Sequence, residues 1–161
     1  MNNLRYLLFD LDGTLTDPKQ GLTSSLQYAL AKLNAPVPSC DELTWCIGPP
    51  LKDSFPILLN TQDEALIDQA VNYYLERYTA GGLFENQVYA GVPELLATLR
   101  SLQYKLFVAT TKLTITAQRI LRHFDLAQYF DEIYGSEPGG IFFDAARLFA
   151  VRNLARREHP F

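Results

Sequence analysis

The sequence predicts an α/β fold in which a helical insertion interrupts a parallel sheet. Short apolar runs at residues 6–9, 105–110 and 132–134 are typical of buried strands. Between the first two of these runs, residues 17–85 show helical periodicity and no convincing strand. The second strand of the predicted sheet comes only after this helical stretch. This order indicates one core with an inserted helical lid. The alternative is a plain helical half of an α+β protein.

Composition narrows the class of protein. The chain has 161 residues, 48% of them hydrophobic, which suits one packed domain with a modest insertion. Its formal net charge of −4 does not indicate nucleic-acid binding. No apolar run approaches the roughly 20 residues of a membrane helix, and no signal-peptide pattern precedes the first strand. Cys40 and Cys46 are typical of free thiols in a reducing compartment, so we expect a cytoplasmic protein.

The first half of the chain is expected to be helical after its opening strand. Asp17 and Pro18 resemble an N-cap and first helical turn, and Ser39 with Glu42 has capping-box spacing. A rigid Pro-Pro turn separates the second and third helices, and Gly81 with Gly82 stops the last. The expected helices are about 18–33, 39–45, 52–59 and 63–79.

The second half returns to alternating strands and helices. The core pattern resumes at Val88, and Pro93 marks the first turn of a helix to about Leu102. A strand at 105–110, a helix at about 114–123 and a short strand at 132–134 follow. This alternation is typical of parallel strands joined by helices.

Asp10 and Asp12 follow the first strand directly, at the end where ligands bind in open α/β sheets. Two carboxylates in one pocket repel unless a cation or proton lies between them. Mg²⁺ takes one or two carboxylates together with waters and phosphate oxygens. One Asp could then attack phosphorus while the other moves protons. The alternative is a Leu-Asp-Gly turn with an Asx-type hydrogen bond.

A second chemical element is Thr110-Thr111-Lys112, at the end of the next strand and before a helix. A hydroxyl and free backbone N–H groups at such a place can donate to phosphate oxygens. Taken alone, Thr110 could simply cap the helix, but its pairing with Asp10 and Asp12 favours a phosphate contact. Lys112 could screen a phosphate or be a solvated residue of the first turn.

Asp10-Leu-Asp-Gly-Thr14, after an apolar strand, resembles the first motif of the haloacid dehalogenase-like (HAD) superfamily, and the Asp at position 12 favours its phosphatases. The resemblance implies a Rossmann-like core at 1–16 and 86–161 and a helical cap at 17–85. It also implies that Asp10 is the nucleophile, that Asp12 is the general acid/base, and that both bind Mg²⁺. Thr110 resembles the phosphate-binding residue of the second motif, and Thr111 and Lys112 resemble the residues that follow it in the phosphoglycolate-phosphatase-like branch, which is the branch that the chain resembles most.

These residues predict a Mg²⁺-dependent hydrolase of a small phosphomonoester that works through an aspartyl-phosphate. Two alternatives remain open, a phosphomutase and a catalytically impaired fragment that binds a ligand or another protein. The turn at residues 47–51 is either a substrate-facing element of the cap or a simple connector.

The resemblance stops after Ser136-Glu137. No Lys follows Lys112, and no Gly-Asp pair with a second acid follows, although the family has both. Asp144 is the last Asp of the chain, and a helical pattern follows it. We therefore expect a truncated or rearranged C-terminus, through a frameshift or a real variant, and a weak Mg²⁺ site. An incomplete sheet would leave an apolar edge for an oligomer contact or a partner to cover.

Overall fold

The computed structural model describes residues 6–137, which divide into two compact units. One unit comprises residues 6–16 and 88–137 and is α/β, and the other, Asp17–Gln87, is mainly helical. The sequence after residue 137, including Asp144 and the expected departure from the family pattern, lies outside the described residues. Among residues 6–137, no helix combines the length and the apolar character needed to cross a membrane.

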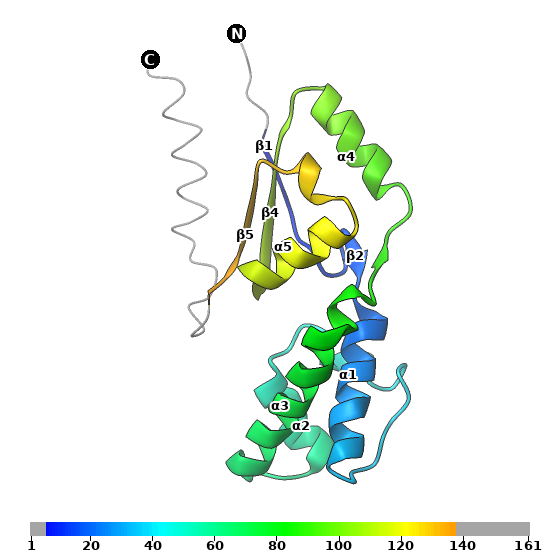
Figure 1. The fold of residues 1–161 in the computed structure, drawn as a ribbon, viewed down its shortest axis with the longest axis vertical. Helices are drawn as coiled ribbons and strands as arrows, with labels where there is room; N and C mark the ends of the chain where they lie inside the picture. Colours follow the sequence, from blue (N-terminus) through cyan, green and yellow to red (C-terminus); the bar gives the residue numbers. More distant parts are fainter. Residues whose placement is uncertain (1–5, 138–161) are drawn as a thin grey trace. The chain divides into compact units, whose positions relative to one another are not determined.

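The α/β unit is built on a three-stranded parallel sheet with β4 in the middle (Figure 1). Its strands are β1 (Tyr6–Phe9), β4 (Lys105–Leu113) and β5 (Glu132–Ser136). Val108 pairs with Phe9 on one side and Ile133 on the other, so the carboxyl ends of all three strands lie at the same end of the sheet. The parallel sheet, together with the helical insertion, confirms the predicted fold class.

Helices connect these strands and supply the rest of the core. They are α4 (Val92–Ser101), α5 (Thr114–His123) and the short 3-10 helix η3 (Ala127–Tyr129). α5 leads from β4 back to β5 and buries one apolar stripe at helical spacing. The fully buried side chains of this unit include Leu11, Leu96, Leu106, Val108, Ala117, Ile120 and Leu121.

Asp131 fastens the start of β5 to its neighbours. Its carboxylate accepts hydrogen bonds from the Arg100 guanidinium at 2.6 Å, the Leu106 N–H at 2.9 Å and the Lys105 ammonium at 3.0 Å. Burial pushes the pKa of Asp131 upward, but the hydrogen bonds from Lys105 and Leu106 and the charge of Arg100 outweigh it and hold the pKa below its ordinary value. The ionised carboxylate therefore stabilises this corner of the sheet.

A row of aromatic rings crosses one face of the sheet. Tyr6 stacks on Phe107 with ring centroids 6.1 Å apart, and Phe107 stacks on Tyr134 at 6.2 Å. Leu8 shares this face, because alternate residues of a strand point the same way, and it is 41% exposed. Within the described residues β1 is an edge strand of the three-stranded sheet. The oligomer or partner expected to cover that edge stays a prediction.

The helical unit contains α1 (Lys19–Lys32), η1 (Thr44–Cys46), α2 (Leu51–Leu59), α3 (Glu64–Ala80) and η2 (Gly82–Phe84). α1 and α3 lie side by side (Figure 1). Asp63 caps α3, because its carboxylate accepts hydrogen bonds from the N–H groups of Ala65 and Leu66. The core of this unit includes Leu26, Ala29, Leu30, Leu43, Phe55, Ile67, Ala70, Tyr74, Tyr78 and Leu83.

A close backbone approach joins the start of α1 to η2. A Cβ on Gly21 would lie 2.0 Å from the carbonyl oxygen of Gly82, so only glycine fits at position 21. Beside this contact, Arg77 donates to both carboxylate oxygens of Glu85 at 2.9 Å and to Ser25 Oγ at 3.3 Å. The two ends of the insertion are therefore tied together within the unit itself.

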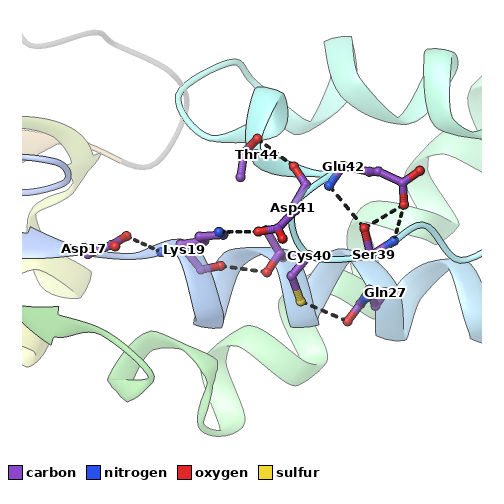
Figure 2. Close-up of polar contacts among 9 residues, drawn as sticks. Asp17, Lys19, Gln27, Ser39, Cys40, Asp41, Glu42 and Thr44 are labelled. Atoms are coloured by element: carbon purple, nitrogen blue, oxygen red, sulfur yellow. Dashed lines mark hydrogen bonds and ion pairs between the residues drawn. The ribbon is translucent and has the colours of Figure 1, made fainter.

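The segment between α1 and α2 is fastened to α1 by polar contacts (Figure 2). Lys19 forms an ion pair with Asp41. Gln27 donates to the carbonyl of Pro38 at 2.8 Å, and Cys40 Sγ donates to Gln27 Oε1 at 3.5 Å. The burial of Cys46 raises the pKa of its thiol. Both cysteines are free, as expected.

Several element boundaries differ from the sequence predictions. α1 begins at Lys19 with Pro18 at the N-cap, while the Asp17 carboxylate accepts a hydrogen bond from the Lys19 N–H. The capping box of Ser39 and Glu42 forms, but it opens a turn and the short 3-10 helix η1 instead of an α-helix. The paired two-residue strands β2 (Thr16–Asp17) and β3 (Gln87–Val88) were not predicted.

Candidate active site

The loop after β1 holds two carboxylates on a tightly bonded backbone. The carbonyl of Leu11 accepts hydrogen bonds from the N–H groups of residues 14, 15 and 16, and the Gly13 N–H donates to the Thr16 carbonyl at 2.8 Å. Gly13 has a φ of +77°, which a glycine adopts at little cost. Leu11 and Leu15 are buried at 0% and 1% exposure. The loop is therefore anchored by its apolar residues, which leaves its acidic residues nearer the surface.

The two carboxylates lie in different surroundings. Asp10 is exposed, and its carboxylate accepts a hydrogen bond from the Leu11 N–H at 2.7 Å. The Asp12 side chain is 26% exposed, and its Oδ1 is buried with no hydrogen-bond partner among the described residues. An accessible carboxylate suits attack on a substrate, whereas a half-buried one with an open lone pair suits a proton, a cation or a donor.

The second predicted element lies where β4 leaves its regular pairing with β5. Ala109 pairs with Tyr134, and the next pair is Leu113 with Ser136, so three residues of β4 face the single residue Gly135 of β5. These three residues are Thr110, Thr111 and Lys112. A bulge of this kind bends the strand and changes where its side chains point.

Gly135 makes this bulge possible. A Cβ at this buried position would lie 2.4 Å from the carbonyl oxygen of Lys112 and 2.7 Å from the backbone nitrogen of Thr114. The Gly135 N–H also donates to Thr114 Oγ1 at 3.2 Å. Gly135 lies just after the strand predicted at residues 132–134, and its role in the bulge was not predicted. An isolated glycine in a strand pattern was the available signal.

The bulge brings Lys112 to Asp12. The Lys112 ammonium lies 2.8 Å from Asp12 Oδ2, and the Lys112 side chain is only 11% exposed. The structure therefore does not support a solvated first-turn lysine, one of the two interpretations that the sequence left open. Thr110 is buried at 5% exposure and its Oγ1 accepts a hydrogen bond from the Lys112 N–H at 3.3 Å, whereas Thr111 is exposed.

The residues present fit a divalent cation held by few protein ligands. Within residues 6–137, no three His, Cys, Asp or Glu side chains gather as a metal site. The unpartnered Asp12 Oδ1 and the exposed Asp10 carboxylate nevertheless offer oxygen ligands. Mg²⁺ is commonly bound by one or two carboxylates with waters and substrate phosphate oxygens completing its shell.

Comparison with known proteins shows the family of the chain. The profile of the haloacid dehalogenase-like hydrolases matches residues 7–140. A 5'-nucleotidase of Pseudomonas aeruginosa is 48% identical over 139 residues, covering 85% of this chain and 62% of the nucleotidase. The tyrosine-protein kinase PtkA of Mycobacterium tuberculosis is 40% identical over 134 residues, which cover 83% of this chain and 45% of PtkA. The chain thus spans about half to two thirds of the length of these curated relatives.

Solved structures show the same fold. The crystal structure of a predicted phosphatase from Clostridium acetobutylicum matches 94% of this chain and 71% of its own, with a TM-score of 0.79 and 42% identity. Phosphoglycolate phosphatases are also among the relatives, in line with the branch that Thr111 and Lys112 resemble. The chain belongs to the haloacid dehalogenase-like hydrolase family.

Proposed function

We propose that this chain carries the site of a Mg²⁺-dependent phosphomonoester hydrolase that works through an aspartyl-phosphate. The observation that carries the proposal is the pairing of an exposed Asp10 with a half-buried Asp12 whose charge Lys112 compensates at 2.8 Å. Family membership and the phosphatase names of the relatives support the same chemistry.

In the proposed reaction Asp10 is the nucleophile. Its carboxylate oxygen attacks phosphorus as the ester P–O bond breaks, and Asp12 gives its proton to the leaving alkoxide. Asp12 then takes a proton from water, whose oxygen attacks the phosphorus of the aspartyl-phosphate and releases inorganic phosphate. A Mg²⁺ ion held by Asp10 and Asp12 would supply charge neutralisation of the transferring phosphoryl group.

Thr110, Thr111 and Lys112 are proposed to hold the phosphoryl group. The Lys112 ammonium carries the positive charge, and the Thr111 hydroxyl is exposed at the bulge. The buried Thr110 hydroxyl already accepts a hydrogen bond from the Lys112 N–H and can still donate. The helical unit Asp17–Gln87 is proposed to be the cap that selects the substrate.

The substrate is proposed to be a small phosphomonoester, such as phosphoglycolate or a nucleoside monophosphate. The names of a 48% identical 5'-nucleotidase and of two phosphoglycolate phosphatases guide this choice. A cytoplasmic location is proposed from the free Cys40 and Cys46 thiols.

The test is release of inorganic phosphate from a panel of phosphomonoesters by the 161-residue chain, with and without Mg²⁺. Asp10→Asn should lower the rate at least about 1,000-fold, because the variant has no carboxylate nucleophile. Asp125→Asn is the matched control, an exposed Asp of the same unit, and should keep full activity. Turnover that survives Asp10→Asn would contradict the aspartyl-phosphate mechanism.

A second candidate function is binding without turnover. It is favoured by the lack of a third acidic side chain beside Asp10 and Asp12 in the described part of the chain. Beryllofluoride with Mg²⁺ mimics a phosphoryl group on a carboxylate. A rise in Tm with beryllofluoride but no turnover would favour the binding fragment, and no rise and no turnover would contradict both candidates.

A further inference from the structure

We infer that Thr16 is a positioning residue for Asp12 and acts through one buried water molecule, which bridges the Thr16 hydroxyl and Asp12 Oδ1. The inference rests on the proposed function, in which Asp12 moves protons, and it adds a residue that holds this carboxylate in place. It follows from two buried oxygen atoms, from the backbone pairing of their residues and from the ion pair on the other carboxylate oxygen.

Two buried side-chain atoms of residues 6–137 lack a hydrogen-bond partner, and they are Asp12 Oδ1 and Thr16 Oγ1. Thr16 is 0% exposed, so its hydroxyl cannot reach bulk water. Buried polar groups are almost always paired with the protein or with an ordered water. A hydroxyl can donate a hydrogen bond and an ionised carboxylate oxygen can only accept one, so these two atoms have complementary needs.

The other fully buried hydroxyls are satisfied, which sets Thr16 apart. The hydroxyls of Thr23, Ser25 and Ser54 are also at 0% exposure, and each donates to the backbone carbonyl four residues earlier. Those three residues lie in helices, where such a carbonyl is always near. Thr16 lies in the two-residue strand β2, which offers its hydroxyl no such local acceptor.

The backbone places the two unpartnered atoms near each other. Asp12 and Thr16 form an isolated parallel bridge, and the Gly13 N–H donates to the Thr16 carbonyl at 2.8 Å. Paired strands lie about 4.7–4.9 Å apart, and paired residues place their side chains on the same side. No hydrogen bond joins the two atoms directly. A single water with two hydrogen bonds of about 2.8 Å spans up to about 5.6 Å, so it matches this spacing.

The second oxygen of the carboxylate is already held. The Lys112 ammonium lies 2.8 Å from Asp12 Oδ2, and the Lys112 side chain is only 11% exposed. With Oδ2 on Lys112 and Oδ1 on the water, the carboxylate is fixed in one orientation. Each carboxylate oxygen has two lone pairs, so Oδ2 keeps one for the proton that Asp12 moves. Fixed geometry matters because a small misplacement of a reacting group lowers the rate strongly.

The direct test is a crystal structure of the 161-residue chain that shows its ordered waters. The wild type should hold one water about 2.5–3.0 Å from both Thr16 Oγ1 and Asp12 Oδ1. Thr16→Val should lose this water, and Thr16→Ser should keep it. A wild-type structure without the water, or with the Thr16 hydroxyl donating to another group, would overturn the inference.

Stability gives a second test, because a bridged and an unpartnered hydroxyl predict opposite signs. If the hydroxyl had no partner, Thr16→Val would remove an unsatisfied buried group and lower the unfolding equilibrium constant. If the water bridges the two residues, Thr16→Val should raise that constant about three- to tenfold, because Asp12 Oδ1 loses its partner. In a chain that already carries Asp12→Ala, Thr16→Val should no longer destabilise the fold. Urea unfolding measures all four chains, and a stabilising Thr16→Val would overturn the inference.

Thr23→Val is the matched control for these unfolding measurements. Thr23 is buried like Thr16, but its hydroxyl donates to the Lys19 carbonyl at 2.8 Å. Its effect on unfolding should therefore be the same with and without Asp12→Ala. If Thr16→Val behaves in the same way, its effect is independent of Asp12 and the inference is wrong.

Turnover shows whether the bridge positions Asp12 for catalysis. Thr16→Val should lower kcat about tenfold or more and leave KM within about twofold, and Thr16→Ser should restore most of kcat. An unchanged kcat in Thr16→Val would refute the positioning role. The crystal structure and the unfolding measurements need no turnover. A chain without phosphatase activity that shows the water and the predicted unfolding changes would refute the proposed function and leave the bridge established.

Discussion

Gly135→Ala tests whether the β4 bulge depends on the absence of a side chain at this position. The added Cβ would lie 2.4 Å from the Lys112 carbonyl oxygen, 2.7 Å from Thr114 N and 2.8 Å from Thr114 Cα. Real Cβ atoms essentially never come closer than 3.0 Å to such atoms, and all three neighbours are backbone. The bulge must therefore move away from β5.

The cost follows from two physical effects. Overpacking of a tight site costs about 1–3 kcal/mol, and losing one nearby hydrogen bond, such as that from Gly135 N–H to Thr114 Oγ1, costs about 1 kcal/mol more. The free energy of unfolding should fall by about 2–4 kcal/mol. At about 2–4 °C per kcal/mol for a chain of this size, Tm should fall by about 4–16 °C.

Thermal unfolding followed by circular dichroism measures the change, and amide hydrogen exchange of residues 105–137 shows where it acts. Gly81→Ala is the matched control, because a Cβ there meets no atom within 4 Å and the φ of −167° suits any residue. It should be neutral or slightly stabilising, by up to about 1 kcal/mol. A Gly135→Ala protein that melts within about 1 °C of the wild type with unchanged exchange would refute the packing argument.

Three further predictions concern stability. Gly21→Ala should lower the Tm of the helical unit by more than Gly135→Ala lowers that of the α/β unit, because its Cβ would lie 2.0 Å from the Gly82 carbonyl oxygen; an unchanged melt would contradict the close approach. Asp63→Ala should cost about 1 kcal/mol in denaturant unfolding, since it removes the N-cap of α3, while Asp63→Asn should keep most of the stability. Asp131→Asn should cost about 1–3 kcal/mol at pH 7 through its charge-assisted hydrogen bonds. Because the folded pKa of Asp131 is lowered, the wild-type advantage should be full above the unfolded pKa of 3.8 and vanish as the pH falls through the lower folded value; an advantage that persists in acid would contradict this.

Local signals were sufficient to predict most of the elements. The apolar run before Asp10, the cap at Asp63 and the proline in the first turn of α4 each depend on a few neighbouring residues, and each element forms within one or two positions of its prediction. The family resemblance rested on a motif of five consecutive residues, and it was confirmed. Features that depend on neighbouring residues could therefore be predicted from the sequence.

The parts that sequence reasoning missed depend on contacts between distant segments. The ion pair of Lys112 was not predicted, because its partner Asp12 lies 100 positions earlier in the chain. The sequence suggested only a solvated lysine or one that faces a phosphate. The bulge that positions Lys112 depends on Gly135, which follows the whole of α5 in the chain. The two-residue strands β2 and β3 are too short to leave a periodic pattern.

The tied ends of the helical insertion have a consequence for folding kinetics. β1 and β4 pair across roughly 100 residues, so closing that loop in an unfolded chain is entropically costly. The Gly21 N–H donates to the Glu85 carbonyl at 3.2 Å, and β2 pairs with β3. If the insertion forms first, the effective loop shortens to roughly 30 residues, which saves about 1 kcal/mol of closure entropy. A long-range sheet would then nucleate as if its strands were near neighbours along the chain.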